Sequence, residues 1–117
     1  MRFLKGLLIV SAALCALPLA ASGAEPRKIT VVAKKYEFTP SRIEVKAGEP
    51  VEITFTSEDT KHGFVSKDLK IEKIVFTRQS PGKVTFTAEK PGTYAFKCAR
   101  FCGMGHGKMK GEIVVTP

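Results

Sequence analysis

The chain has 117 residues, a length that holds one domain and excludes a second. It carries 19 Lys and Arg residues against 11 Asp and Glu, which gives a formal charge of +8 at pH 7. A positive charge of this kind favours acidic proteins or anionic surfaces as partners.

Residues 1–24 have the layout of a secretory signal peptide. Arg2 and Lys5 give a basic start, residues 7–19 form an apolar run, and small residues end the segment. We expect cleavage after residue 24 and export to the periplasm or another extracytoplasmic compartment, which leaves residues 25–117 as one domain. An exported domain rarely meets nucleic acid, so we expect no nucleic-acid partner.

Two alternatives would keep the chain at a membrane. One is a retained anchor, but the apolar run is shorter than the roughly 20 residues that a bilayer span needs. The other is a lipid attached to Cys15, but Leu14 stands where such sites have a small residue. After the signal segment the chain has no other apolar span, so we expect no integral membrane segment in the mature protein.

Short strands separated by turns are predicted for the rest of the chain. Apolar and polar residues alternate in most of these segments, which is typical of strands with one face in a core and one in water. The predicted strands are residues 29–33, 42–47, 51–56, 84–88, 94–98 and 113–115. Pro-Gly pairs at residues 81–82 and 91–92 indicate type II turns. Strands at this spacing predict an all-β sandwich.

The phase of one predicted strand bears on chemistry. If Tyr94 and Phe96 face the core, Cys98 faces it too, because side chains alternate along a strand. Its thiol would then lie at the rim of the sandwich, partly screened from water.

A cluster of metal-binding residue types follows this strand. Cys98, Cys102, His106 and Met109 fall within twelve residues. Soft sulfur ligands together with imidazole select copper over hard cations such as Mg²⁺ or Ca²⁺. The cluster therefore predicts a copper site, in which the metal lowers the thiol pKa and supplies the thiolate.

His62 is the only other histidine, and it lies in the connection after the strand at 51–56. A lone histidine is weak evidence for a ligand. It gains value here because the cluster lacks a second nitrogen donor. Phe101 and Met104 have two interpretations, either as core residues or as an apolar contact patch near His106.

The spacing Cys-x3-Cys-x3-His-x2-Met at residues 98–109 resembles the CuA motif of cytochrome c oxidase subunit II and of nitrous oxide reductase. His62-Gly63-Phe64 resembles the upstream ligand motif of the same proteins, and residues 28–117 are similar to small cupredoxin domains. The resemblance implies a Greek-key β-sandwich that holds two copper ions.

The implied ligands are the side chains of His62, Cys98, Cys102, His106 and Met109 and the backbone carbonyl of Arg100. In the resembled site both thiols bridge the two ions. His62 and Met109 would complete one ion, and His106 with the Arg100 carbonyl would complete the other.

The chain departs from oxidase subunit II in three ways. Arg100 stands where that subunit usually has a glutamate, the chain has no tryptophan, and the transmembrane hairpin of the subunit is missing. The resemblance is therefore to the copper domain alone, and we expect a stand-alone protein rather than a working oxidase subunit.

Two alternatives to a binuclear site stay open. Cys98 and Cys102 could form a disulfide, as two cysteines in an oxidising compartment often do. His62, Cys102, His106 and Met109 alone also satisfy the ligand set of a mononuclear blue-copper site. Cys98 would then be spare, so this residue decides between one copper ion and two.

The expected function is one-electron transfer with a redox partner protein, and no enzymatic activity is expected. Copper storage or delivery is the alternative, since it uses the same ligands. Lys97, Arg100, Lys108 and Lys110 cluster around the ligands and would form a basic rim that steers an acidic partner. The oligomeric state is not predicted.

Overall fold

The computed structural model describes residues 25–117. The predicted signal peptide and its two alternatives fall on residues 1–24, outside the described residues. Among residues 25–117 there is no helix with the length and apolarity required to cross a membrane.

Nine strands and one short 3₁₀ helix make up the described part of the chain. They are β1 (Arg27–Lys34), β2 (Glu37–Thr39), β3 (Arg42–Lys46), β4 (Pro50–Ser57), β5 (His62–Ser66), β6 (Ile71–Phe76), β7 (Gly82–Thr87), β8 (Gly92–Lys97), η1 (His106–Lys108) and β9 (Lys110–Thr116).

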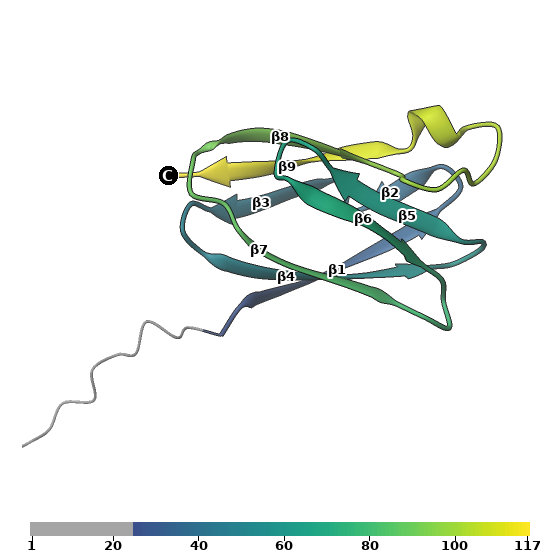
Figure 1. Ribbon diagram of the computed structural model, residues 1–117, viewed down its shortest axis with the longest axis horizontal. Coiled ribbons are helices and arrows are strands. Elements are labelled where there is room, and N and C mark those ends of the chain that lie inside the picture. Colours follow the sequence, from purple (N-terminus) through teal and green to yellow (C-terminus); the bar gives the residue numbers. More distant parts are fainter. Residues whose placement is uncertain (1–24) are drawn as a thin grey trace, which may run out of the picture.

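The strands form two sheets that pack face to face (Figure 1). One sheet has the order β2-β1-β4-β7, and the other has the order β3-β9-β8-β5-β6. β1 and β4 pair in parallel, as do β3 and β9, while the other pairs are antiparallel. The chain passes repeatedly from one sheet to the other, so the predicted Greek-key β-sandwich is confirmed.

Side chains alternate between core and solvent as the sequence predicts. Val51, Ile53 and Phe55 of β4 are fully buried, while the residues between them are partly exposed. The ring of Phe55 lies 4.5 Å from that of Phe64 and 5.4 Å from that of Phe76, by centroids. These contacts join the two sheets, and burying each such side chain contributes about 1.5–3 kcal/mol.

Three strands were not predicted from the sequence, namely β2, β5 and β6. β5 is buried at four of its five positions and contains Gly63 and Ser66, so it has neither alternation nor a β-rich composition. His62 was expected in a connection, but the structure places it as the first residue of this buried strand.

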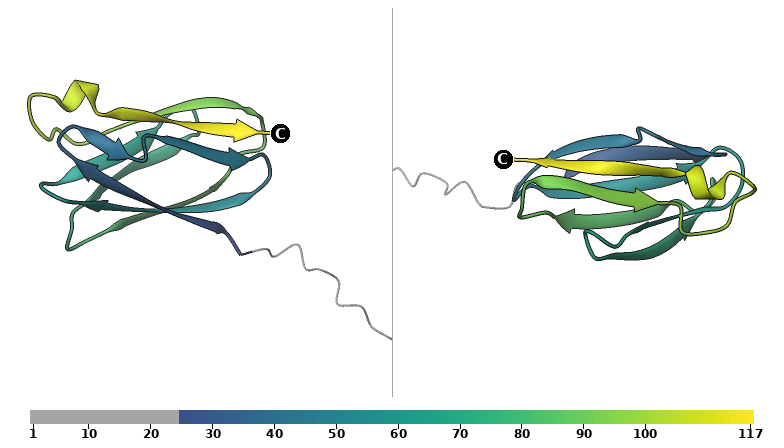
Figure 2. Two further views of the ribbon diagram at one scale, coloured as in Figure 1. Left: turned by 180° about the vertical axis from the view of Figure 1, so that it is seen from behind. Right: turned by 90° about the horizontal axis from the view of Figure 1, so that it is seen from above.

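The two ends of the sandwich differ in what they carry. The loop between β8 and β9, with η1, lies at one end, together with the β1–β2 turn and the β4–β5 connection (Figures 1 and 2). We call this end the metal pole. Residue 27, where β1 begins, and the C-terminus lie at the opposite end.

Candidate metal centre

Strand pairing brings His62 to the cysteine loop. β5 and β8 are antiparallel and pair at Val65 and Lys97, so the start of β5 lies beside the residues that follow β8. A Cβ added to Gly63 would lie 3.0 Å from the backbone nitrogen of Arg100, which shows how closely the two segments pack. His62 and Cys98, which are 36 positions apart in the sequence, are thus brought together by the pairing of strands in the sheet.

The two thiols lie next to each other in the interior. Cys98 Sγ is 3.8 Å from Cys102 Sγ, and both side chains are buried. Both cysteines are free, so the disulfide that was one alternative for this pair is not formed in this structure.

Each thiol has its own pair of neighbouring donors. Cys98 Sγ lies 4.0 Å from Nδ1 of His62 and 3.1 Å from the carbonyl oxygen of Arg100. Cys102 Sγ lies 3.6 Å from Nδ1 of His106 and 3.7 Å from Sδ of Met109. The structure therefore brings all six residues of the predicted ligand set into one cluster. Their role as ligands stays a prediction.

The β8–β9 loop is closed by its own backbone. The Cys98 N–H donates to the carbonyl of Met109 at 2.9 Å, which fastens the two ends of the loop together. Inside it, the His106 N–H donates to the carbonyl of Gly103 at 3.1 Å. Gly103 has φ +140°, a conformation that favours glycine, so this turn depends on that residue.

Asp59 was not among the predicted site residues, yet it holds the His62 ring. Nε2 of His62 lies 2.7 Å from Oδ1 of Asp59. An ionised carboxylate only accepts hydrogen bonds, so Nε2 carries the proton and the Nδ1 lone pair faces the thiols. The only sequence signal was a carboxylate three residues before the histidine, in the same connection.

The Asp59 carboxylate is ionised at neutral pH. Partial burial raises the pKa of Asp59, but hydrogen bonds from two backbone N–H groups and from His62 outweigh it and lower the pKa from 3.8 to about 2. The backbone donors are Lys35 and Thr60, at 2.7 and 2.6 Å.

The thiol of Cys102 is protonated when no metal is bound. Burial raises the pKa of Cys102 from 9.0 to about 11, and the neighbouring Cys98 adds to the rise. A metal that binds here must displace the proton, so binding is coupled to proton release. Two thiols, two imidazoles and a thioether form a soft donor set that fits copper rather than Mg²⁺ or Ca²⁺.

The outer edge of the cluster is apolar and exposed. His106 is half-buried, and its ring centroid lies 5.6 Å from that of Phe101. Phe101 is 70% exposed and Met104 is 96% exposed. The interpretation of these two residues as core is therefore wrong, and both lie on the surface of the ligand loop.

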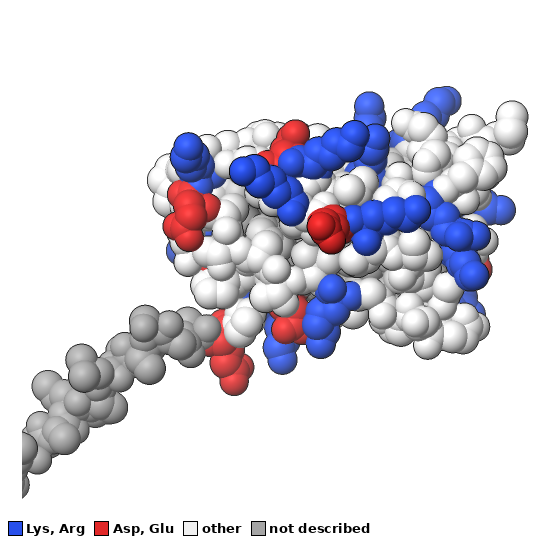
Figure 3. Space-filling view, viewed as in Figure 1, with Lys and Arg blue, Asp and Glu red and all other residues white. Residues whose placement is uncertain are grey.

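The four cations predicted to form a rim are all exposed, and within residues 25–117 none of them belongs to an ion pair. They are Lys97, Arg100, Lys108 and Lys110. Lys and Arg also gather over much of the face seen in Figure 3, including the side toward the metal pole.

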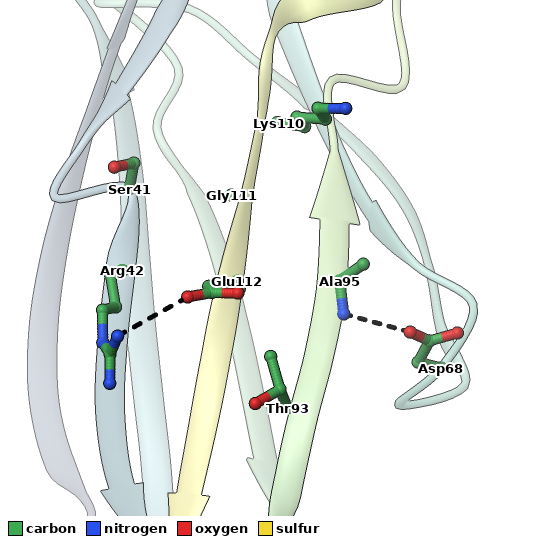
Figure 4. A pocket seen from close by; sticks show the side chains of 8 residues that line it. All are labelled: Ser41, Arg42, Asp68, Thr93, Ala95, Lys110, Gly111 and Glu112. Carbon is green, nitrogen blue, oxygen red and sulfur yellow. Dashed lines mark hydrogen bonds and ion pairs between the residues drawn. The ribbon is translucent and has the colours of Figure 1, made fainter.

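A hollow of about 460 Å³ lies elsewhere, on the outer face of the five-stranded sheet (Figure 4). Of its four charged residues, Arg42, Asp68 and Glu112 have partners within the described residues, while Lys110 has none. Arg42 Nη1 lies 3.8 Å from Glu112 Oε1, and the Ala95 N–H donates to Asp68 Oδ2 at 3.0 Å. None of the six predicted ligands lines this hollow, so it is not part of the metal centre.

The fold and this donor cluster define a class of protein. The sequence model of the family described as "Cupredoxin-like domain" matches residues 6–115. Because the match covers most of the chain, the chain belongs to the cupredoxin-like family.

Its relatives include a subunit of cytochrome c oxidase and a chain of a heme-copper terminal oxidase. The chain is 33% identical over 97 residues to cytochrome c oxidase subunit 2 of Thermus thermophilus, an alignment that covers 80% of this chain and 69% of that protein. A chain in the cryo-EM structure of a heme-copper terminal oxidase dimer is 28% identical, with a TM-score of 0.68 over 77% of this chain and 65% of the oxidase chain.

A second similar structure shows the fold alone. The periplasmic domain of subunit II of cytochrome oxidase from Bradyrhizobium japonicum is 18% identical, with a TM-score of 0.70, and the alignment covers 77% of this chain and 83% of that one. The chain spans about two thirds of the length of the two relatives named before it. The resemblance to oxidase subunit II stated from the ligand motif is confirmed.

Proposed function

We propose that the protein is an extracytoplasmic one-electron carrier whose copper centre is binuclear and of the CuA type. One observation carries the proposal: two thiols 3.8 Å apart each have an imidazole nitrogen and a further donor beside them. In a site with one copper ion Cys98 would be spare. Here it lies within the cluster, between His62 and the carbonyl of Arg100.

Copper, when bound, supplies the exchange of one electron. The chain holds the donor groups in place before copper binds. Asp59 fixes the His62 ring, and the backbone hydrogen bond from Cys98 to Met109 closes the loop. Preorganised donors need little rearrangement between redox states. We propose no catalytic reaction, because each thiol already has two donor groups beside it.

The half-buried ring of His106 is the proposed path for the electron. It connects Cys102 inside the protein with Phe101 at the surface. The unpaired cations around it favour a partner with an acidic docking surface. Electron transfer to such a partner should slow as ionic strength rises, since salt screens exposed charges. A rate that does not depend on salt would contradict the acidic partner but not the copper site.

Reconstitution of the purified protein with copper tests the proposal. We expect two copper ions per chain and a seven-line hyperfine pattern in the EPR spectrum, which reports one unpaired electron shared by two coppers. The variant Cys98→Ser should bind one ion and give a four-line pattern. One ion and four lines in the unchanged protein would establish the mononuclear alternative. Transfer of the copper to an acceptor chelator without reversible redox cycling would indicate storage or delivery.

A further inference from the structure

The β1–β2 turn, residues 35–36, touches the ligand loop through an aromatic ring. A Cβ added to Gly105 would overlap the ring of Tyr36, and a Cβ added to Gly103 would overlap its hydroxyl group and lie 3.1 Å from the nearest ring carbons. The ring therefore lies directly against the loop backbone on both sides of Met104. These two glycines stand between Cys102 and His106, two of the predicted ligands.

The same turn also reaches the other half of the centre. The N–H of Lys35 donates to Oδ2 of Asp59 at 2.7 Å. Oδ1 of the same carboxylate accepts the hydrogen bond from His62. One turn of the β1–β2 hairpin thus contacts both segments that supply an imidazole, although these segments are far apart in the sequence.

The hydrogen bonds of the loop segment around Met104 are internal to the loop. Within the described residues they run from the His106 N–H to Gly103 and from the Lys108 N–H to Gly105. The side chain of Met104 is almost fully exposed, so it does not hold the segment against the sandwich. The contact with Tyr36 therefore supports the middle of the loop, while the buried side chains of Cys102 and Met109 hold its two ends.

We propose that Tyr36 is a positioning residue of the metal centre. Its ring sets the distance of His106 from the two thiols by supporting the backbone that connects Cys102 to His106. The proposal rests on the proposed copper site, but its structural part concerns the metal-free protein and is tested there independently.

Two glycines of the loop offer a matched pair of variants. Gly105 has φ −92°, so its backbone accepts alanine without strain, and the three atoms nearest to an added Cβ all belong to Tyr36. A Cβ added to Gly107 meets nothing within 4 Å. Gly105→Ala and Gly107→Ala therefore differ in whether the new methyl group displaces the Tyr36 ring.

Hydrogen exchange in the metal-free protein tests the contact. The amides of His106 and Lys108 should exchange faster in Gly105→Ala and Tyr36→Ala than in the unchanged chain, because the loop opens more easily. Gly107→Ala and Tyr36→Phe should exchange at the original rate. In the Tyr36→Ala background Gly105→Ala should have no further effect, as a double-mutant cycle requires if both act through one contact.

Copper binding tests the positioning role. Gly105→Ala and Tyr36→Ala should release copper to a chelator about tenfold faster or more, because substitution of a residue that supports a metal ligand usually weakens metal binding by at least that factor. The same two variants should shift the visible absorption spectrum. Gly107→Ala should change neither. The proposal is overturned if Gly105→Ala releases copper at the same rate as Gly107→Ala. It is also overturned if Gly105→Ala speeds copper release as much in the Tyr36→Ala background as in the unchanged chain. If the unchanged protein binds no copper, the proposed function fails, while the exchange experiment still decides whether Tyr36 supports the loop.

Discussion

The two imidazoles of the candidate centre have contrasting surroundings. His62 begins a strand, is fully buried and has its outer nitrogen fixed by Asp59. His106 begins a 3₁₀ turn in a loop and touches the exposed ring of Phe101. The inner half of the centre is thus built into the fold, whereas the outer half depends on the conformation of one loop. His62 thus belongs to the rigid part of the centre, and His106 belongs to the part that lies near the surface.

The largest expected effect separates these two halves. His62→Ala should abolish copper binding and also lower the free energy of unfolding of the metal-free protein by about 1–3 kcal/mol, because it leaves a cavity and removes one of the hydrogen bonds to the Asp59 carboxylate. His106→Ala should abolish copper binding but change stability by no more than about 0.5 kcal/mol. Urea denaturation without metal measures both values. Equal losses of stability would contradict the comparison.

A smaller effect is expected from Asp59→Asn, which tests how Asp59 holds the His62 ring. An asparagine can offer N–H to Nε2 of His62 and so favour the tautomer whose Nδ1 carries the proton. Copper affinity should fall about 10–100-fold in a chelator competition. Glu58→Gln removes the same charge one residue away and should leave the affinity unchanged. If the two variants lose affinity equally, charge rather than the tautomer explains the effect.

The smallest expected effect concerns pH. The pKa of the Cys102 thiol is about 11 in the folded protein, above its ordinary value of 9.0. The folded state therefore holds this proton more tightly, and the resulting stabilisation is fully present below pH 9 and is lost as the pH rises through 11. Thermal melting of the metal-free protein between pH 8 and 11 should show this decline. Cys102→Ser should flatten it, and an unchanged slope would exclude the thiol as its source.

Local patterns in the sequence were sufficient to predict the regular strands and to predict that the Cys98 side chain points into the protein. Alternation predicted β4 and β7 well, and the phase of Phe96 correctly placed Cys98 in the interior. The motif of the β8–β9 loop grouped its donors, because residues within one short loop are forced to be neighbours. The structure places the two thiols and the Arg100 carbonyl, which the resemblance to the CuA motif already implied as ligands, next to one another.

Contacts between distant segments could not be predicted in this way. His62 joined the candidate set through family resemblance, since the β5–β8 pairing that brings it to Cys98 leaves no local signal. Tyr36 was missed for the same reason, since it contacts loop glycines that are far away in the sequence. Asp59 lies only three residues before His62, but its support from the distant Lys35 N–H leaves no local signal. The sequence around Asp59 and around Tyr36 has no unusual feature, so their roles become visible only in the folded structure.

The opposite placement of the chain ends and the metal pole has a practical consequence. Residue 27 and the C-terminus lie at the end of the sandwich away from the β8–β9 loop (Figure 1). A molecule fixed to an electrode or a bead through a tag at Pro117 would point its His106 edge into solution. Attachment through surface lysines would instead produce mixed orientations, some with that edge covered. C-terminal immobilisation is therefore the geometry in which exchange with a dissolved partner is uniform from molecule to molecule.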